Sequence, residues 1–270
     1  MLENYQKAVD NIREDIKTYI TKNNIKSLVL GVSGGIDSAL CAVLAEPICK
    51  ELNFPLLGYS IRIQTNKDEE ISRAKNIGEN FCSEFKEIDL SNLFLTTVKE
   101  LENEEYDQTG NKEYKIRMGN IKARLRMIYL YNQARKNNGL VLSTDNYTEL
   151  LLGFWTLHGD VGDFGMIQKL WKTEVYAMSR YLTDIFKTNN ETDKAAALIA
   201  CVEAVPTDGL GITNSDLDQL GANSYEEVDK ILIEFLQSGQ TLNKDVIGRH
   251  TASQFKRDNP YNTPREIIEE

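Results

Sequence analysis

The feature that most restricts the fold of this chain is a glycine-rich loop between a strand-like and a helix-like segment. An apolar run rich in strand-forming residues covers 27–32, and a helical pattern covers 37–52. The loop at their junction consists of Gly31, Val32, Ser33, Gly34, Gly35, Ile36, Asp37 and Ser38. In open parallel sheets, ligands bind at such junctions, where strands end. The loop therefore predicts an α/β fold with a binding site at one edge of the sheet.

The remainder of the chain continues the same alternation of strands and helices. Further strand-like runs cover 56–63, 85–90 and 139–143, and helical periods cover 67–81, 91–101 and 114–135. This order predicts a doubly wound parallel sheet with helices on both faces. We expect a single domain over 1–270, with an N-terminal helix within 1–22 and an irregular tail over 258–270.

The charge balance limits the kinds of partner. The chain has 31 basic and 41 acidic residues and a net charge of −10. Because binding to nucleic acid or to an anionic membrane surface needs a basic face, neither partner is expected. The N-terminus has no apolar signal segment, and the four cysteines form no CxxC pair. We therefore expect a cytoplasmic protein without a structural zinc site.

The loop has the chemistry of a phosphate site. Gly34 and Gly35 allow a tight turn that directs several N–H groups at one anion, and the helix that follows adds its positive dipole end. The hydroxyls of Ser33 and Ser38 are further donors. The residue directly before Ser38 is not a lysine, so the loop is not a Walker A motif. Asp37 would repel phosphate unless a divalent cation lay between them, so it is either a Mg²⁺ ligand or a helix cap.

A second candidate region is the predicted helix within 112–136. It carries eight basic residues and one acid, Glu113, in an otherwise acidic chain. Such a local concentration of positive charge suits a bound phosphate or dinucleotide. The alternative is a solvated basic face.

Four ordered motifs resemble those of a known family. The sequence SGGIDS at 33–38 is similar to the SGGxDS loop of ATP-pyrophosphatases, which split ATP into AMP and pyrophosphate. Within that group, GNIKARLRM at 119–127, STDNYTE at 143–149 and the segment from GFWT at 153 to KT at 172 resemble NAD synthetases. The chain is thus identified as a member of the ammonia-dependent NAD synthetase family. The resemblance implies a Rossmann-like fold of the adenine nucleotide alpha hydrolase type.

The resemblance also implies a reaction. Ammonia would amidate deamido-NAD through an acyl-adenylate, with ATP as co-substrate and Mg²⁺ as the metal ion. The implied ligands are the loop, Thr144, Lys172 and Thr207 for ATP, Asp37 and Glu149 for Mg²⁺, and Arg124, Asp163 and Lys256 for deamido-NAD.

The catalytic roles follow from what this reaction requires. Asp37 and Lys172 would offset the charge of the transferring phosphates, and Asp160 or Asp163 would take a proton from ammonium. From the residues alone, these two acids could equally be loop caps. Thr144 or Asp145 could likewise cap the next helix.

Some positions depart from the family pattern. Asn146 stands where bacterial members commonly have His, Leu157 where many have Lys, and Phe255 where His is common. Extra residues occur within 188–205. No amidohydrolase domain is recognised, so we expect the chain to use free ammonia or ammonia from a partner chain.

Three other functions are considered. An NMN synthetase acting on nicotinate mononucleotide would share the motifs. Another ATP-pyrophosphatase, such as a tRNA-modifying enzyme, is disfavoured by the acidic charge and by the lack of a catalytic cysteine pair. A non-catalytic nucleotide sensor would need neither the second acid nor Lys172.

The N-terminal helix bears on assembly. An apolar stripe runs along it, formed by Leu2, Tyr5, Val9, Ile12, Ile16 and Tyr19. Such a stripe must be buried, either on the chain's own sheet or on a second subunit. Because the family is dimeric, with Arg124 on a helix near the interface, we expect a homodimer.

Overall fold

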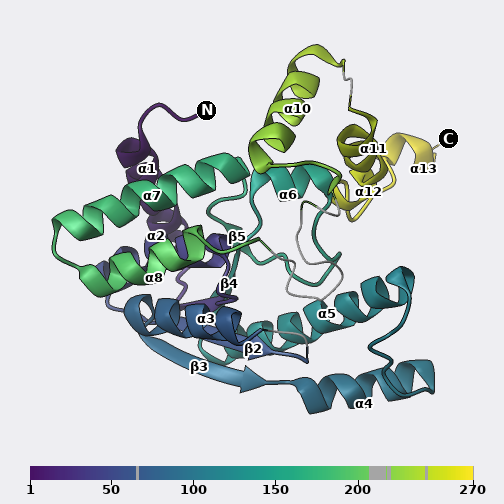
Figure 1. Ribbon diagram of the computed structural model, residues 1–270, viewed down its shortest axis with the longest axis horizontal. Helices are drawn as coiled ribbons and strands as arrows, with labels where there is room; N and C mark the ends of the chain where they lie inside the picture. The colour runs from purple at the N-terminus through teal and green to yellow at the C-terminus, as the bar shows by residue number, and fades with distance from the viewer. Residues whose placement is uncertain (65–66, 207–216, 218–219, 241–242, 270) are drawn as a thin grey trace.

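The fold is built on a five-stranded parallel sheet with the strand order β3-β2-β1-β4-β5 (Figure 1). The computed structural model describes residues 1–64, 67–206, 217, 220–240 and 243–269. The strands are β1 (Ser27–Gly31), β2 (Leu56–Arg62), β3 (Glu84–Asp89), β4 (Gly139–Ser143) and β5 (Phe164–Gly165). In β1, Leu28 pairs with Leu56 on one side and with Leu140 on the other. The chain winds outward from β1 to β3 and then returns to β4 on the other side of β1. The switch point, at which the direction of winding reverses, therefore lies between β1 and β4, and ligands bind at such points in parallel sheets.

One face of the sheet carries the larger core. Leu28 and Leu30 of β1 and Leu142 of β4 are buried there against five helices. These helices are α1 (Tyr5–Lys22), α2 (Ile36–Leu52), α3 (Asp68–Phe81), α7 (Lys172–Thr188) and α8 (Thr192–Val202). Helix α2 is buried along almost its whole length. It therefore holds the glycine-rich loop in a fixed place at its N-terminus.

The opposite face is covered by α4 (Ser91–Glu102) and α5 (Lys112–Lys136). Val29 and Val141 point to this side, one residue away from the leucines of the first core. Since side chains alternate along a strand, strands covered on both faces are apolar throughout. The sheet thus has helices on both faces, as the sequence predicts.

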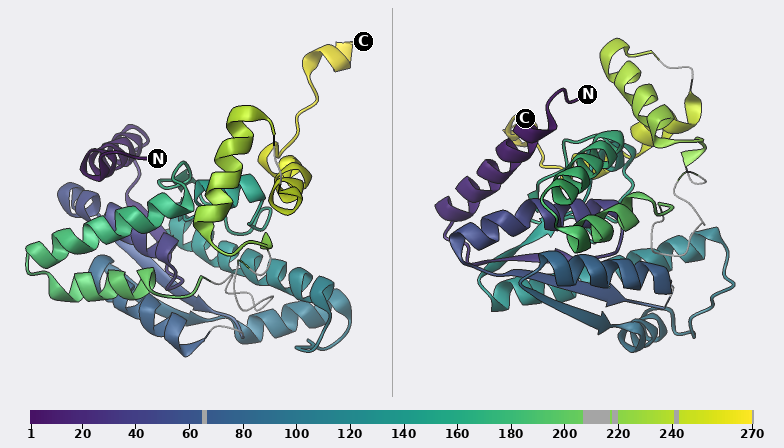
Figure 2. Two further views of the ribbon diagram at one scale, coloured as in Figure 1. Left: turned by 45° about the horizontal axis from the view of Figure 1, so that its top comes forward. Right: turned by 60° about the vertical axis from the view of Figure 1, so that its left-hand side comes forward.

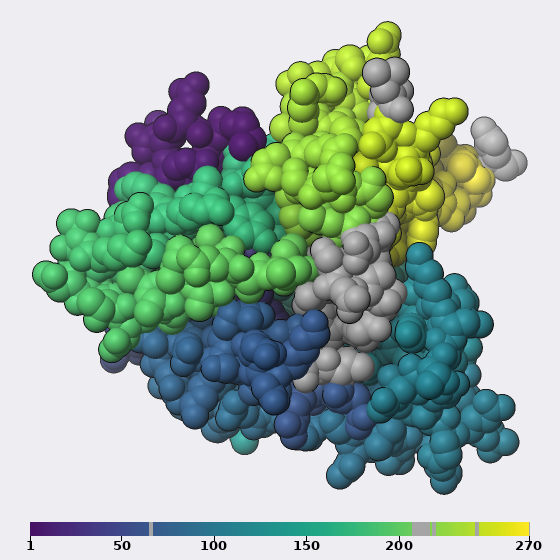
Figure 3. All heavy atoms as spheres, in the orientation of Figure 1, coloured from purple at the N-terminus to yellow at the C-terminus, as the bar shows by residue number. Residues whose placement is uncertain are grey.

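The C-terminal helices form a lobe at the switch-point end of the molecule (Figures 1 and 3). Helices α6 (Tyr147–Leu152), α10 (Tyr225–Ser238) and α11 (Lys244–Ala252) share a third apolar cluster. The chain continues through α12 (Gln254–Arg257) to α13 (Arg265–Glu269), which projects from this lobe (Figure 2). No helix in the described ranges is long and apolar enough to cross a lipid bilayer.

The four predicted strands and the helices between them are confirmed to within two residues at each end. The two-residue strand β5 is absent from the prediction, because so short a segment leaves no periodic pattern. The extra residues within 188–205 form α8, which packs on α3 and α7. The tail is not wholly irregular, since Arg265 and Glu269 form an ion pair one turn apart in α13.

The apolar stripe of the N-terminal helix lies against its own chain. Val9 and Ile16 are fully buried, and Arg13 donates a hydrogen bond to the Val43 carbonyl of α2. Of the predicted stripe, Tyr19 keeps 39% of its surface exposed. The stripe therefore does not support the expected dimer.

Candidate active site

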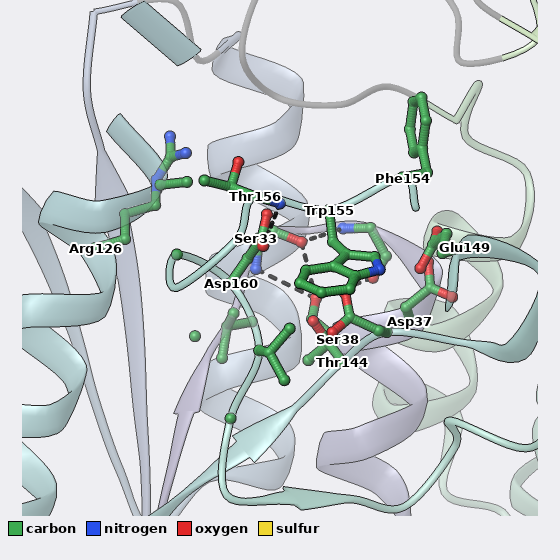
Figure 4. Close-up of a pocket in the computed structure, with 18 of the residues that line it drawn as sticks. Ser33, Asp37, Ser38, Arg126, Thr144, Glu149, Phe154, Trp155, Thr156 and Asp160 are labelled. Atoms are coloured by element: carbon green, nitrogen blue, oxygen red, sulfur yellow. Dashed lines mark hydrogen bonds between the residues drawn. The ribbon is translucent and has the colours of Figure 1, made fainter. Parts of the chain in front are cut away.

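The site is a pocket of about 520 Å³ at the switch point. Its lining comes from the glycine-rich loop, the ends of β2 and β4, helices α3 and α5, and the segments around Trp155 and Lys256. The close-up in Figure 4 shows loop residues, Thr144, Glu149 and Asp160 directed into one space. The carboxyl ends of the central strands thus bring together residues far apart in the sequence.

The loop is held in shape by its own hydroxyls. The N–H of Ser33 donates to Oγ of Ser38 at 3.2 Å, and the Ser38 hydroxyl donates to the Gly35 carbonyl at 3.1 Å. Gly34 has φ +81°, and a Cβ there would lie 2.2 Å from the Glu70 carbonyl oxygen of α3. Only glycine allows both this conformation and this close approach. The turn that the sequence predicts is therefore held in one fixed shape.

Beside the loop, one ammonium group bridges two carboxylates. Nζ of Lys172 lies 2.5 Å from Oδ2 of Asp37 and 3.1 Å from Oε1 of Glu149. Lys172 is only 2% exposed. Burial lowers the pKa of its ammonium, but the two carboxylates outweigh this effect and hold the pKa well above its ordinary value. The predicted metal ligands and the predicted phosphate-binding lysine thus form one charged cluster.

Asn146 positions both acids of this cluster. Its Nδ2 donates to Oδ1 of Asp37 at 2.8 Å, and its Oδ1 accepts from the N–H of Glu149 at 3.0 Å. Oε2 of Glu149 in turn accepts from the Asn146 N–H, which completes a capping box at the start of α6. The cap of this helix is therefore Asn146, and the alternative in which Thr144 or Asp145 caps it is wrong. Position 146 is one where the sequence departs from the family pattern.

Hydrogen bonds from helix α10 hold the backbone around Lys172 in place. Asp229 accepts hydrogen bonds from Oγ1 of Thr148 at 2.5 Å and from the N–H of Thr173 at 2.9 Å. Thr148 Oγ1 also accepts the Lys172 N–H at 2.9 Å. One turn earlier in α10, the Tyr225 ring lies 5.3 Å from the Lys172 ammonium. The C-terminal lobe thus fixes both the backbone and the charged end of this lysine.

Two acids with raised pKa values occupy the β4 side of the pocket. Burial, with Asp160 and Glu149 nearby, raises the pKa of Asp145 well above its ordinary value. Asp160 faces the pocket, yet protein atoms crowd it enough that desolvation raises its pKa to about 6. Oδ1 of Asp160 accepts the N–H of Thr156 at 2.7 Å. Asp160 therefore both caps a loop and presents a carboxyl that titrates near neutral pH.

Aromatic and basic side chains form the wall nearest the C-terminal lobe. The Trp155 indole projects into the pocket, and its Nε1 has no hydrogen-bond partner among the described residues (Figure 4). Lys256 donates to the carbonyl oxygens of Gly153 and Trp155, and desolvation lowers its pKa. Lys256 thus lies at the pocket.

Of the other predicted site residues, some line the pocket and some lie outside it. Thr144 lines the pocket, and Thr207 lies outside the described residues. Arg124 is exposed on α5 and donates to the Leu157 carbonyl, outside the pocket lining. Asp163 accepts from Tyr131 Oη and the Val141 N–H, both at 2.9 Å, and is likewise not part of the lining. In this chain alone, these last two residues hold structure together.

Comparison with known proteins gives a consistent pattern. The sequence profile described as NAD synthase matches residues 8–260. An NH₃-dependent NAD⁺ synthetase from Finegoldia magna is 32% identical over 261 residues, which are 94% of either chain. The NMN synthetase structure from Francisella tularensis aligns over 97% of this chain and 99% of its own, with 25% identity and a TM-score of 0.77. The NH₃-dependent NAD synthetase structure from Campylobacter jejuni aligns over 97% and 100%, with 24% identity and a TM-score of 0.70.

Proposed function

This chain belongs to the NAD synthase family, and we propose that it amidates deamido-NAD with ammonia in an ATP-dependent reaction. The nicotinate carboxylate attacks the α-phosphorus of ATP, forming an acyl-adenylate and releasing pyrophosphate. Ammonia then attacks the acyl carbon, and AMP leaves. We take the chain to be a single catalytic domain.

The observation that carries this proposal is the Asp37–Lys172–Glu149 cluster beside the preformed loop. A phosphate site alone would suit many nucleotide-binding proteins. The buried lysine next to it supplies positive charge, and the two acids can hold a divalent cation, where a pentavalent phosphorus and a departing pyrophosphate build up negative charge. A non-catalytic sensor has no need for such a cluster.

The residues also fit a Mg²⁺ ion. Asp37 and Glu149 both contact the same ammonium, so their oxygens are close enough together to share a cation. Mg²⁺ is commonly held by one or two carboxylates with substrate phosphates completing its shell. In the described ranges, no group of three or more acidic, His or Cys side chains is placed to hold a metal. When bound between these acids and ATP, Mg²⁺ would neutralise phosphate charge.

The chain's own residues perform the remaining tasks. Lys172 would offset phosphate charge from its place beside Asp37 and Glu149, the two acids that would hold the cation. Asp160, with a pKa of about 6, is mostly ionised at neutral pH and accepts a proton from the nitrogen as ammonia bonds to the acyl carbon. Lys256 and Trp155 hold the nicotinate end of the substrate on the wall nearest the C-terminal lobe.

The proposal includes a homodimer that completes the substrate site. Arg124 and Ile128 lie one turn apart on the exposed side of α5, and Ile128 is 57% exposed. An exposed arginine beside an apolar side chain suits an interface at which a dinucleotide is bound. This arrangement gives Arg124 the substrate-binding role that it lacks within one chain.

One structural neighbour favours a second candidate substrate. The Francisella tularensis protein, which shares the fold over nearly the whole chain, is an NMN synthetase. The two substrates present the same nicotinate carboxylate and differ in the adenylate part. Initial rates of AMP formation with each substrate at equal concentration, with ammonium and Mg²⁺, test the assignment. A higher kcat/KM for deamido-NAD is expected, and a higher value for nicotinate mononucleotide would overturn the substrate assignment.

A further inference from the structure

Arg73 of α3 lies at the phosphate loop and has no place in the reaction described so far. Its Nε donates a hydrogen bond of 2.9 Å to the carbonyl oxygen of Gly34. The side chain is half-buried and lines the pocket, together with Gly35 and Ser33 of the loop. The residue stands on a helix that neither the loop motif nor the other motifs include.

The contact between α3 and the loop is close and rigid. A side chain at Gly34 would meet the Glu70 carbonyl oxygen at 2.2 Å and the Ala74 N–H nitrogen at 3.0 Å. Helix α3 is itself fixed by Ala74 and Ile77, which are fully buried in the main core. Arg73 therefore cannot move away from the loop without moving the helix or breaking its own hydrogen bond.

The charge of Arg73 is not paired with an acid in the described part of the chain. Within the described part of the chain it has no ion pair, whereas Lys172 has two and Arg62 is paired with Asp89. The nearby Glu70 carboxylate accepts the Lys67 N–H at 3.3 Å. A guanidinium anchored through Nε keeps a planar pair of terminal NH₂ groups, the geometry that binds phosphate through two parallel hydrogen bonds.

We propose that Arg73 binds the pyrophosphate leaving group at the loop, as a second cation supplied from α3. This inference rests on the proposed function, because it takes the loop to be the pyrophosphate site. The carbonyl of Gly34 points to α3 and fixes the guanidinium, so the loop itself orients the residue. Lys172, from α7, acts next to the acids, while Arg73 acts from a different helix. Two cations from separate elements would hold pyrophosphate more firmly than the loop N–H groups alone.

The test is calorimetric titration of the full chain with pyrophosphate in excess Mg²⁺, and separately with AMP. Arg73→Gln should weaken pyrophosphate binding by roughly tenfold to a hundredfold, the range for a lost hydrogen bond to a charged group. Arg73→Lys should restore part of the affinity, and AMP binding should stay unchanged in both variants. Lys75→Gln is the matched control, because Lys75 is exposed on the same helix and pairs with Glu79 on the helix surface.

Two results would overturn the inference while leaving the proposed function intact. In the first, Arg73→Gln binds pyrophosphate as tightly as the native chain. In the second, Arg73→Gln weakens the binding of AMP and of pyrophosphate equally, and Arg73→Lys restores neither affinity. The second pattern would mean that Arg73 only supports the shape of the loop. A native chain that binds no pyrophosphate, and forms no AMP from ATP with either pyridine substrate, would overturn both.

Discussion

Replacing Lys172 by methionine should destabilise the chain and abolish its activity. Methionine keeps the apolar stem but removes the ammonium that bridges Asp37 and Glu149, whose side chains are 17% and 15% exposed. Removing one partner from a buried ion pair costs about 3–5 kcal/mol, because a buried charge is left uncompensated. The loss of a charge that stabilises the transition state should lower kcat by about 10² or more.

The pH dependence separates this explanation from simple loss of packing. In the native chain the pKa of Lys172 is raised, so its contribution is present throughout neutral pH and is lost only above its folded pKa. The variant can relieve the repulsion between these acids when Glu149, whose pKa burial raises to about 7 in the native chain, takes up a proton. Its deficit in unfolding free energy should therefore shrink as the pH falls towards about 4.

Urea unfolding at several pH values without Mg²⁺ measures this deficit. Lys187→Met is the control, because Lys187 lies on the same helix in an exposed pair with Asp184 and should lose at most about 1 kcal/mol. A Lys172→Met deficit no larger than that of the control, or one independent of pH, would refute the electrostatic account of the cluster.

Three other substitutions test neighbouring parts of the site. Asp145→Asn should raise the unfolding free energy at pH 7.5 but not at pH 4, because an acid with a raised pKa destabilises the fold only above its pKa in the unfolded chain. A difference in unfolding free energy between variant and native chain that is the same at both pH values would contradict this. For Asp160, kcat/KM for free ammonia should fall as the pH drops through about 6, and Asp160→Asn should show low activity without that step. Asp229→Asn should cost about 1–3 kcal/mol by unfolding and also lower kcat, whereas an unchanged kcat would show that Asp229 does not position Lys172.

The sequence predicts the sheet and the loop well because their signals are local. Apolar runs such as 139–143, bounded by polar turns, can form little else than buried strands. The turn of the loop is formed by consecutive residues, so its glycines can be recognised from the sequence. The resemblance to the family then places Lys172 and Glu149 at the same site.

Other features depend on contacts between distant segments. Arg73 gives no local signal, because its role depends on α3 packing against Gly34, 39 residues earlier in the chain. Asp229 is likewise a single acid on a helix until the fold brings it to Thr148 and Thr173. The cap at Asn146 could have been recognised from its spacing to Glu149, which matches a capping box. Arg124 and Asp163 keep a predicted role that a single chain cannot test.

The central claim is that the substrate carboxylate attacks ATP at the α-phosphorus. Deamido-NAD labelled with oxygen-18 in its nicotinate carboxylate tests it directly, by mass spectrometry of the products formed with ammonium and Mg²⁺. One labelled oxygen should appear in AMP and none in pyrophosphate, since the carboxylate oxygen stays on the α-phosphate when ammonia displaces AMP. Unlabelled AMP, or label in inorganic phosphate formed together with ADP, would contradict the acyl-adenylate account.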